Sequence, residues 1–135
     1  MNPIVRNVLA VLLGLVVTML VNGGLIALSA SVIPPPAGVD PNNMESLKAN
    51  IHLFHAKHFV FPYMAHALGS LLGAFVAAKL AATRKMIFAL VIGGIHLIGG
   101  IMAATMIPAP TWFIASDLIL SYLPMAWIGG RLARG

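Results

Sequence analysis

The sequence contains no cysteine and few charged residues. Without cysteine there is no disulfide, no thiolate metal site and no cysteine nucleophile. Charged residues make up only 8% of the 135 residues, and just three are acidic, whereas 60% of the residues are hydrophobic. This balance excludes an ordinary soluble domain, because charged residues form about a quarter of such domains. The mean hydropathy of +0.98 instead indicates an integral membrane protein.

Four apolar stretches are long enough to cross a membrane. They cover residues 4–33, 59–82, 86–107 and 111–130, and each reaches the roughly 20 residues that a transmembrane helix requires. We therefore predict an all-α polytopic membrane protein, in which residues 1–135 form one domain of two transmembrane hairpins. The first stretch follows Arg6 in the manner of a signal peptide, but it is long for a signal sequence. We interpret it as a spanning helix.

The distribution of lysine and arginine predicts the orientation. Positive residues near the ends of spans tend to stay in the cytoplasm, and most of them lie beside the two termini or between the second and third spans. Only Lys48 and Lys57 lie in the loop 34–58, where Asp40 and Glu45 balance them. We expect both termini in the cytoplasm and this loop outside. Basic residues at a membrane face also explain the net charge of +5 without a nucleic-acid partner.

The loop between the first two spans contains a second helical pattern. Apolar residues recur at helical spacing from Asn42 to Lys57, which predicts a short amphipathic helix on the outer surface. This segment carries His52, His55 and His58, and imidazole is a common metal ligand. Successive residues at this spacing diverge by about 60° around a helix, so the three rings do not converge easily. An interfacial helix that happens to carry histidine is the favoured interpretation, and we expect no bound cofactor.

Asp117 is the most informative residue, because it is the only charged residue in the stretch 111–130. A carboxyl group at membrane depth costs about 2.5 to 3.5 kcal/mol and normally has a partner. Two histidines, His66 and His96, lie in other spans. At a rise of about 1.5 Å per residue, His66 and Asp117 each lie about 10 Å below the outer edge, and His96 about 16 Å below it. We therefore predict that His66 and Asp117 form a pair.

Small residues predict that both histidines face protein rather than lipid. In the second span they recur every four positions, a pattern that lets helices approach closely in lipid: Ala65, Gly69, Gly73, Ala77 and Ala81. Asn22 on the first span and Ser121 on the fourth complete a predicted intramembrane polar site around His66, Asp117 and His96. Pro124 cannot donate to the Leu120 carbonyl, which predicts a broken fourth helix beside this site.

Several short motifs give the chain a resemblance to a known group of proteins. They occur in this order along nearly the whole chain: Pro34–Asp40, Ala65–Gly69, Val76–Ala81, Pro108–Trp112 and Asp117–Leu118. In this the chain resembles uncharacterised small bacterial membrane proteins with four spans. The resemblance implies a bacterial inner (cytoplasmic) membrane location. It implies no activity, cofactor or catalytic residue.

Two functional hypotheses follow. In the first, a small transporter or channel moves protons or a small polar solute past His66 and Asp117, and it forms a homo-oligomer because one four-helix bundle has little interior. In the second, a non-transporting scaffold or accessory subunit uses its outer amphipathic helix and its small-residue stripes to bind other membrane proteins or lipid. Haem binding through His96 is weaker, because the estimated depths of the two histidines differ by about 6 Å. An enzyme is not expected, since no nucleophile accompanies a histidine and a carboxylate at a recognisable spacing.

Overall fold

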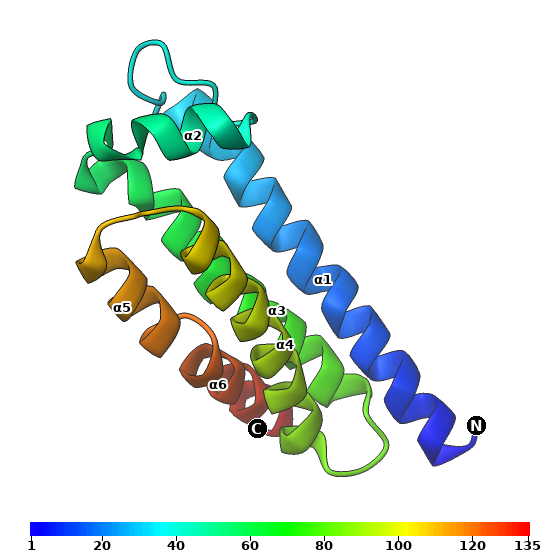
Figure 1. Ribbon diagram of the computed structural model, residues 1–135. Coiled ribbons are helices and arrows are strands. Elements are labelled where there is room, and N and C mark those ends of the chain that lie inside the picture. Colours follow the sequence, from blue (N-terminus) through cyan, green and yellow to red (C-terminus); the bar gives the residue numbers. More distant parts are fainter.

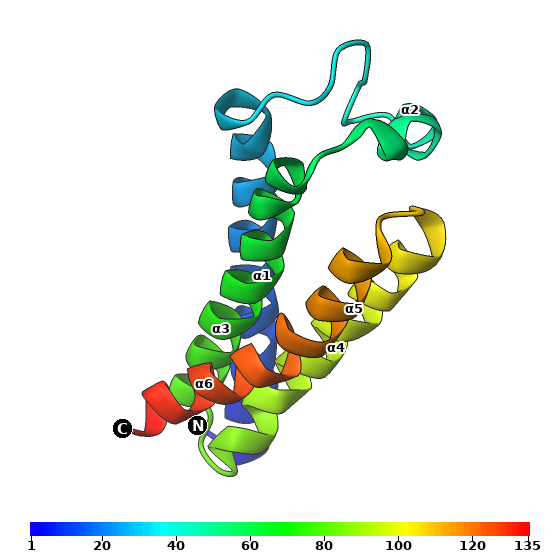
Figure 2. The ribbon, with the colours of Figure 1, turned by 90° about the vertical axis from the view of Figure 1, so that its left-hand side faces the viewer.

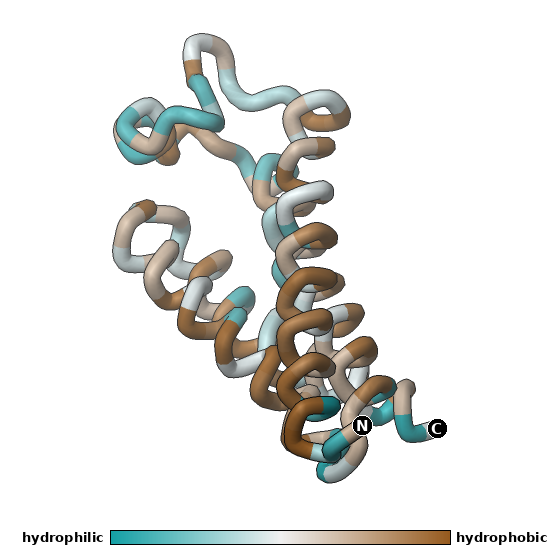
Figure 3. Tube along the Cα trace, turned by 90° about the vertical axis from the view of Figure 1, so that its right-hand side faces the viewer, coloured by the Kyte–Doolittle hydropathy of each residue, from teal (hydrophilic) through white to brown (hydrophobic).

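The computed structural model describes residues 1–135, and all of its regular secondary structure is helical. Three spans are continuous helices, α1 (Pro3–Val32), α3 (Val60–Leu80) and α4 (Lys85–Met106), whereas the fourth consists of α5 (Thr111–Leu120) and α6 (Leu123–Arg134) (Figure 1). All four spans are long and apolar enough to cross a membrane. Hydrophilic segments gather mainly at the two ends of the bundle (Figure 3). The chain is a multi-pass membrane protein, as predicted.

The bundle has two distinct ends. Both termini lie at one end, called here the terminal end, and the loop 34–58 lies at the other, called the loop end (Figure 1). At the terminal end, the Arg6 side chain donates to the Leu80 carbonyl at 2.7 Å. The Lys85 amine donates to three carbonyls near the end of α3, at 2.8 to 3.3 Å. These bonds satisfy carbonyls that the end of a helix leaves free, and so they fix the turn between α3 and α4.

α1 packs along α3 through small residues. A Cβ added to Gly14 of α1 would lie 2.8 Å from the carbonyl oxygen of Gly73 in α3, so the two backbones are nearly in contact. All five residues of the predicted α3 stripe are buried. The prediction that this stripe is a helix interface is therefore confirmed. Close backbone approach supplies the packing contacts that replace a hydrophobic driving force in lipid.

The two halves of the bundle are packed differently. The terminal half is closed by one core cluster, which consists almost entirely of alanine: Ala74, Ala77, Ala78, Ala89, Ile92, Ala126 and Ala133. Towards the loop end the helices diverge, so that α1 and α3 lean away from α4 and α5 (Figure 2). A smaller cluster of Ile51, Phe59 and Phe113 connects the loop to α3 and α5 there. The bundle is thus tight at one end and splayed at the other.

The loop differs from the prediction of one helix over residues 42–57. α2 (Met44–Asn50) is shorter, and two separate 3₁₀ turns follow it, at Ile51–Leu53 and Ala56–Phe59. The backbone is extended at Phe54 between the two turns. This break turns the second 3₁₀ turn towards α3, so that apolar side chains from both turns enter one buried cluster. The prediction of a continuous helix was wrong because it considered surface periodicity and not this tertiary contact.

The fourth span is broken where the sequence predicts. α5 ends at Leu120 and α6 begins at Leu123, with Pro124 in its first turn. Proline has no amide hydrogen for the Leu120 carbonyl and fits well at a helix start. The break allows α5 to follow the splayed half of the bundle while α6 packs against α3 and α4 in the closed half (Figure 2).

Candidate intramembrane site

His66 and Asp117 make the contact that the sequence predicts. His66 on α3 places Nδ1 2.8 Å from Oδ1 and 2.9 Å from Oδ2 of Asp117 on α5. Asp117 is only 4% exposed, so its carboxylate faces protein rather than lipid. Because an ionised carboxylate only accepts hydrogen bonds, we assign the hydrogen to Nδ1. The pair therefore leaves Nε2 of His66 free for another partner.

Tyr122, absent from the predicted site, is its third member. Its hydroxyl donates to Oδ2 of Asp117 at 3.0 Å. Its fully buried ring stacks on His66, with ring centroids 5.5 Å apart and planes 27° apart. The ring lies against Gly100 of α4, where a Cβ would collide with the tyrosine hydroxyl. Asp117 is thus held from two sides, by an imidazole and by a phenol.

The break between α5 and α6 explains why Tyr122 reaches the carboxylate. On a continuous helix, residues five apart diverge by about 140°. The turn at Ser121 and Tyr122 instead brings the tyrosine back towards Asp117. The sequence could have indicated this contact. A tyrosine inside the membrane needs a hydrogen-bond partner, and Asp117 is the only acidic residue in that stretch.

His96 lies closer to the pair than the depth estimate predicts. Its ring is edge-on to the rings of His66 and Tyr122, at centroid distances of 6.0 and 4.9 Å. Its Nδ1 is 2.8 Å from the Ser70 hydroxyl. The depth estimate assumes parallel helices, whereas α4 is tilted against α3 (Figure 2). The Tyr122 ring occupies space beside both imidazoles, which further weakens the haem interpretation.

Asn22 and Ser121 lie at the edge of this group but do not bond to it. Asn22 Oδ1 and Ser121 Oγ are buried without a hydrogen-bond partner. Asn22 lies near Gly69 of α3, the same glycine that borders His96. Buried polar atoms without a protein partner are positions where ordered water or a ligand is expected. The structure therefore brings His66, Asp117 and His96 together and leaves the other two predicted residues as neighbours.

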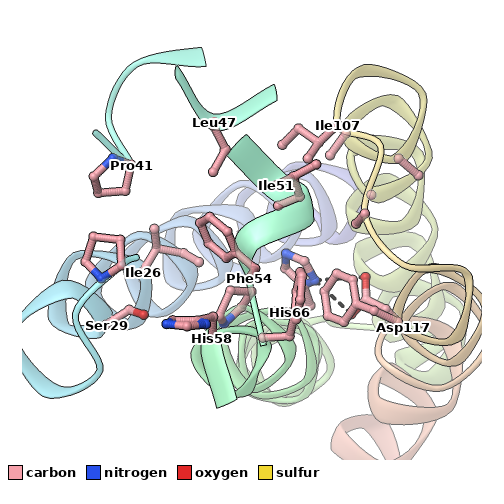
Figure 4. A pocket seen from close by; sticks show the side chains of 18 of the residues that line it. Ile26, Ser29, Pro41, Leu47, Ile51, Phe54, His58, His66, Ile107 and Asp117 are labelled. Carbon is pink, nitrogen blue, oxygen red and sulfur yellow. Dashed lines mark hydrogen bonds and ion pairs between the residues drawn. The ribbon is translucent and has the colours of Figure 1, made fainter. Parts of the chain in front are cut away.

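A cavity of about 640 Å³ connects the site with the loop end. This volume is within the range of about 300 to 1,000 Å³ that small-molecule pockets occupy. His66 and Asp117 line its deep end, and most of the remaining lining is apolar (Figure 4). The second ring nitrogen of His66 is turned into the cavity, away from Asp117 (Figure 4). The free nitrogen of the pair is therefore accessible from the cavity.

The three loop histidines do not gather around a common point. The backbone N–H of His55 donates to Nδ1 of His58 at 2.8 Å, and the two rings stack at 5.9 Å. His52 belongs to the preceding 3₁₀ turn. No group of three or more histidine, aspartate or glutamate side chains is arranged to hold a metal ion. The broken loop helix thus gives no support to a metal site at His52, His55 and His58.

Comparisons with protein families, curated proteins and solved structures find no match. The resemblance to uncharacterised bacterial four-span proteins therefore rests on sequence motifs, with which the four membrane-length helices agree. The function has to be inferred from the site itself.

Proposed function

We propose that this protein is a small transporter that binds one solute molecule in the cavity through the His66–Asp117 pair. The supporting observation is the cavity, which runs from the loop end to an ionisable pair inside the bundle and stops above the closed terminal half. Ionisable groups inside a membrane protein commonly mark solute or proton pathways. A bundle with a cavity in one half and a closed core in the other half matches one state of a carrier.

We propose further that His66 exchanges a proton during transport. When the ring is neutral, Nδ1–H donates to Asp117 and Nε2 accepts a hydrogen bond; when it is protonated, both nitrogens donate. Imidazole changes charge near neutral pH more readily than any other unperturbed side chain. The bond to Asp117 and the stacking on Tyr122 hold the ring in the same place in both forms. The pair is therefore suited to take up and release a proton without moving, and no enzymatic step is proposed.

Proton flux into liposomes tests this proposal. The protein is reconstituted into vesicles made from the total lipid extract of the producing cells, with a pH-sensitive dye inside, and a membrane potential is applied. Wild type should acidify the lumen faster than protein-free vesicles, and Asp117→Asn should return the rate to the protein-free level. Ser116→Ala is the matched control, because this hydroxyl bonds only to carbonyls of its own helix. Wild-type vesicles no more permeable than empty ones would contradict the proposal.

The proposed orientation places the loop end outside a bacterial inner membrane and both termini in the cytoplasm. The basic residues at the terminal end support it, because such residues tend to stay cytoplasmic. Since the chain has no cysteine, single introduced cysteines report their side directly. Glu45→Cys should react with a membrane-impermeant maleimide in intact cells, and Arg134→Cys only after permeabilisation. The opposite pattern would reverse the orientation.

An accessory subunit is a second candidate function. Gly24 on α1 and Gly99 on α4 are exposed, and a Cβ at either position would meet open space. Exposed glycines on a membrane-spanning helix let a helix of another protein, or of a second copy of this chain, approach closely in lipid. Purification in a mild detergent distinguishes these outcomes. A stoichiometric larger partner favours the accessory function, and a defined multimer of this chain favours a homo-oligomeric transporter.

A further inference from the structure

We infer that the solute is a membrane-soluble amphiphile, an apolar molecule with one hydroxyl or carbonyl group, which reaches His66 sideways from the surrounding lipid. The inference rests on the proposed function for the role of His66. It adds the chemical class of the solute and the route by which it arrives.

The walls of the cavity indicate an apolar solute. Apart from His66 and Asp117 at the deep end, the polar side chains that line it are Ser29, Asn42 and His58 near the loop end. A sugar or a hydrated ion would leave most of its polar groups unpaired against the apolar walls, and burying a polar group without a hydrogen-bond partner is unfavourable. An apolar body with one polar group avoids this cost.

One side of the cavity is closed by aromatic contacts that join α3, and the 3₁₀ turn directly before it, to α5. Phe59 and Phe113 pack with ring centroids 4.7 Å apart, and Tyr63 lies 6.1 Å from Phe113. The Tyr63 hydroxyl also donates to the Ser116 carbonyl at 3.2 Å. Below these contacts the His66–Asp117 pair links the same two helices. A solute cannot enter between α3 and α5 without separating them.

The opposite side, between α1 and α4, has no such closure. Both helices line the cavity there with small residues spaced three and four apart, on one face of each helix: Gly23, Ala27 and Ala30 on α1, and Gly100, Ala103 and Ala104 on α4. Most of these residues are exposed. They lie in helices long and apolar enough to cross a membrane, so the gap between α1 and α4 lies at the depth of the bilayer. This side of the cavity therefore opens into the bilayer.

The loop covers the cavity towards water. Leu47, Ile51 and Phe54 extend over it from α2 and the 3₁₀ turn that follows (Figure 4). Ile51 is buried in the cluster that connects the loop to α3 and α5. An apolar cover above and an opening at the side favour access from lipid over access from the aqueous phase.

The polar end of the solute is matched best by Nε2 of His66, which has no protein partner. Asp117 is only 4% exposed and already accepts hydrogen bonds from His66 and Tyr122, so little of its carboxylate is accessible to a solute. The remaining free partner facing the cavity is Nε2 of His66, which accepts from a hydroxyl when the ring is neutral and donates to a carbonyl when it is protonated. A solute with one such group can bond in either protonation state.

Spin labels distinguish a lipid-filled cavity from a water-filled one. Labels at Ala27→Cys and Ala103→Cys should collide more with oxygen, which partitions into lipid, than with a water-soluble nickel chelate. Val16→Cys, at an exposed apolar position on α1, and Glu45→Cys, in the exposed loop, provide the lipid and water references. Nickel accessibility at both cavity positions close to that of the loop reference would overturn the inference.

Four probes with the same tail then test the polar group: decanol, decane, decanoate and decyltrimethylammonium. The readout is the ¹⁵N resonance of His66 in nanodiscs, assigned by its loss in His66→Gln. Decanol should shift this resonance in a saturable way, and the three other probes should not. His52→Gln, outside the cavity, should keep the shift, whereas Ala103→Phe, which fills the opening, should reduce it. A decanol shift that does not saturate, or an equal shift from a charged probe, would overturn the inference.

These results separate the inference from the proposed transport. Saturable decanol binding without proton flux would leave the solute class standing and contradict transport. Proton flux through a protein whose two cavity labels are open to the nickel chelate would leave transport standing and contradict the solute class.

Discussion

Replacing Tyr122 with phenylalanine removes one hydroxyl from the centre of the site and leaves the ring in place. This hydroxyl donates to Asp117 at 3.0 Å inside a fully buried environment, so solvent cannot replace it. Polar contacts in membrane bundles average about 0.6 kcal/mol, but hydrogen bonds to charged groups contribute about 1.5 to 3 kcal/mol. Because the acceptor is a buried carboxylate, we expect Tyr122→Phe to lower the free energy of unfolding by about 1.5 to 3 kcal/mol.

Tyr63→Phe is the matched control for this substitution. Its hydroxyl donates to a neutral carbonyl, that of Ser116, at 3.2 Å and at a half-buried position. The expected loss is therefore about 0.6 kcal/mol. Both variants are unfolded by titration with sodium dodecyl sulfate in mixed micelles, and helix content is followed by circular dichroism. The loss from Tyr122→Phe should also shrink in an Asp117→Asn background, because the acceptor is then uncharged. A loss no greater than that of Tyr63→Phe, or one unaffected by Asp117→Asn, would refute the idea that the phenol supports the carboxylate.

Three further substitutions test the packing of the bundle and the turn after α3. Gly73→Ala should lower the free energy of unfolding by about 1 to 3 kcal/mol in the same titration. Its Cβ would lie 2.7 Å from the Gly14 carbonyl oxygen and would overlap the Thr18 hydroxyl. Gly99→Ala is the control and should be nearly neutral, because its Cβ meets open space. Lys85→Met should lower the midpoint of thermal unfolding, because it removes the donor to three carbonyls near the end of α3. A midpoint equal to that of wild type would show that water satisfies those carbonyls equally well.

The spans were predictable from sequence because their signal is local. A long apolar stretch in a membrane protein has to be helical, since only a helix satisfies its own backbone in lipid. The points where helices end or break were also predictable from nearby residues. Pro34 closely follows the first span, and Pro124 breaks the fourth span. The partner of Asp117 could be found because few ionisable groups lie at membrane depth and a carboxylate there needs one.

The parts that were not predicted depend on how helices lie relative to one another. Counting residues along a helix gives the depth of a side chain but not the tilt of the helix. This count placed His96 deeper than His66, whereas their ring centroids are only 6.0 Å apart. Tyr122 reaches Asp117 because of a backbone turn and because Gly100, on another helix, leaves room for its ring. The loop folds as α2 and two 3₁₀ turns rather than as one helix, because its apolar residues meet Phe113, more than fifty positions away in the sequence. None of these contacts produces a periodic pattern in the amino-acid sequence.

Transport requires a motion that binding alone does not. α1 and α3 pack closely along their small residues, whereas α1 and α4 diverge beside the cavity. A carrier has to close this splayed half and open the alanine-packed half in turn. Spin labels at Ala27 and Ala103, on opposite walls of the cavity, should therefore show two distance populations in nanodiscs by pulsed electron paramagnetic resonance. Asp117→Asn should change their ratio, because the pair links α3 to α5 within the splayed half. A pair at Val16 and Leu72, on α1 and α3, should keep one distance. One unchanged distance at the cavity labels in both proteins would contradict alternating access and favour an accessory subunit that only holds the amphiphile.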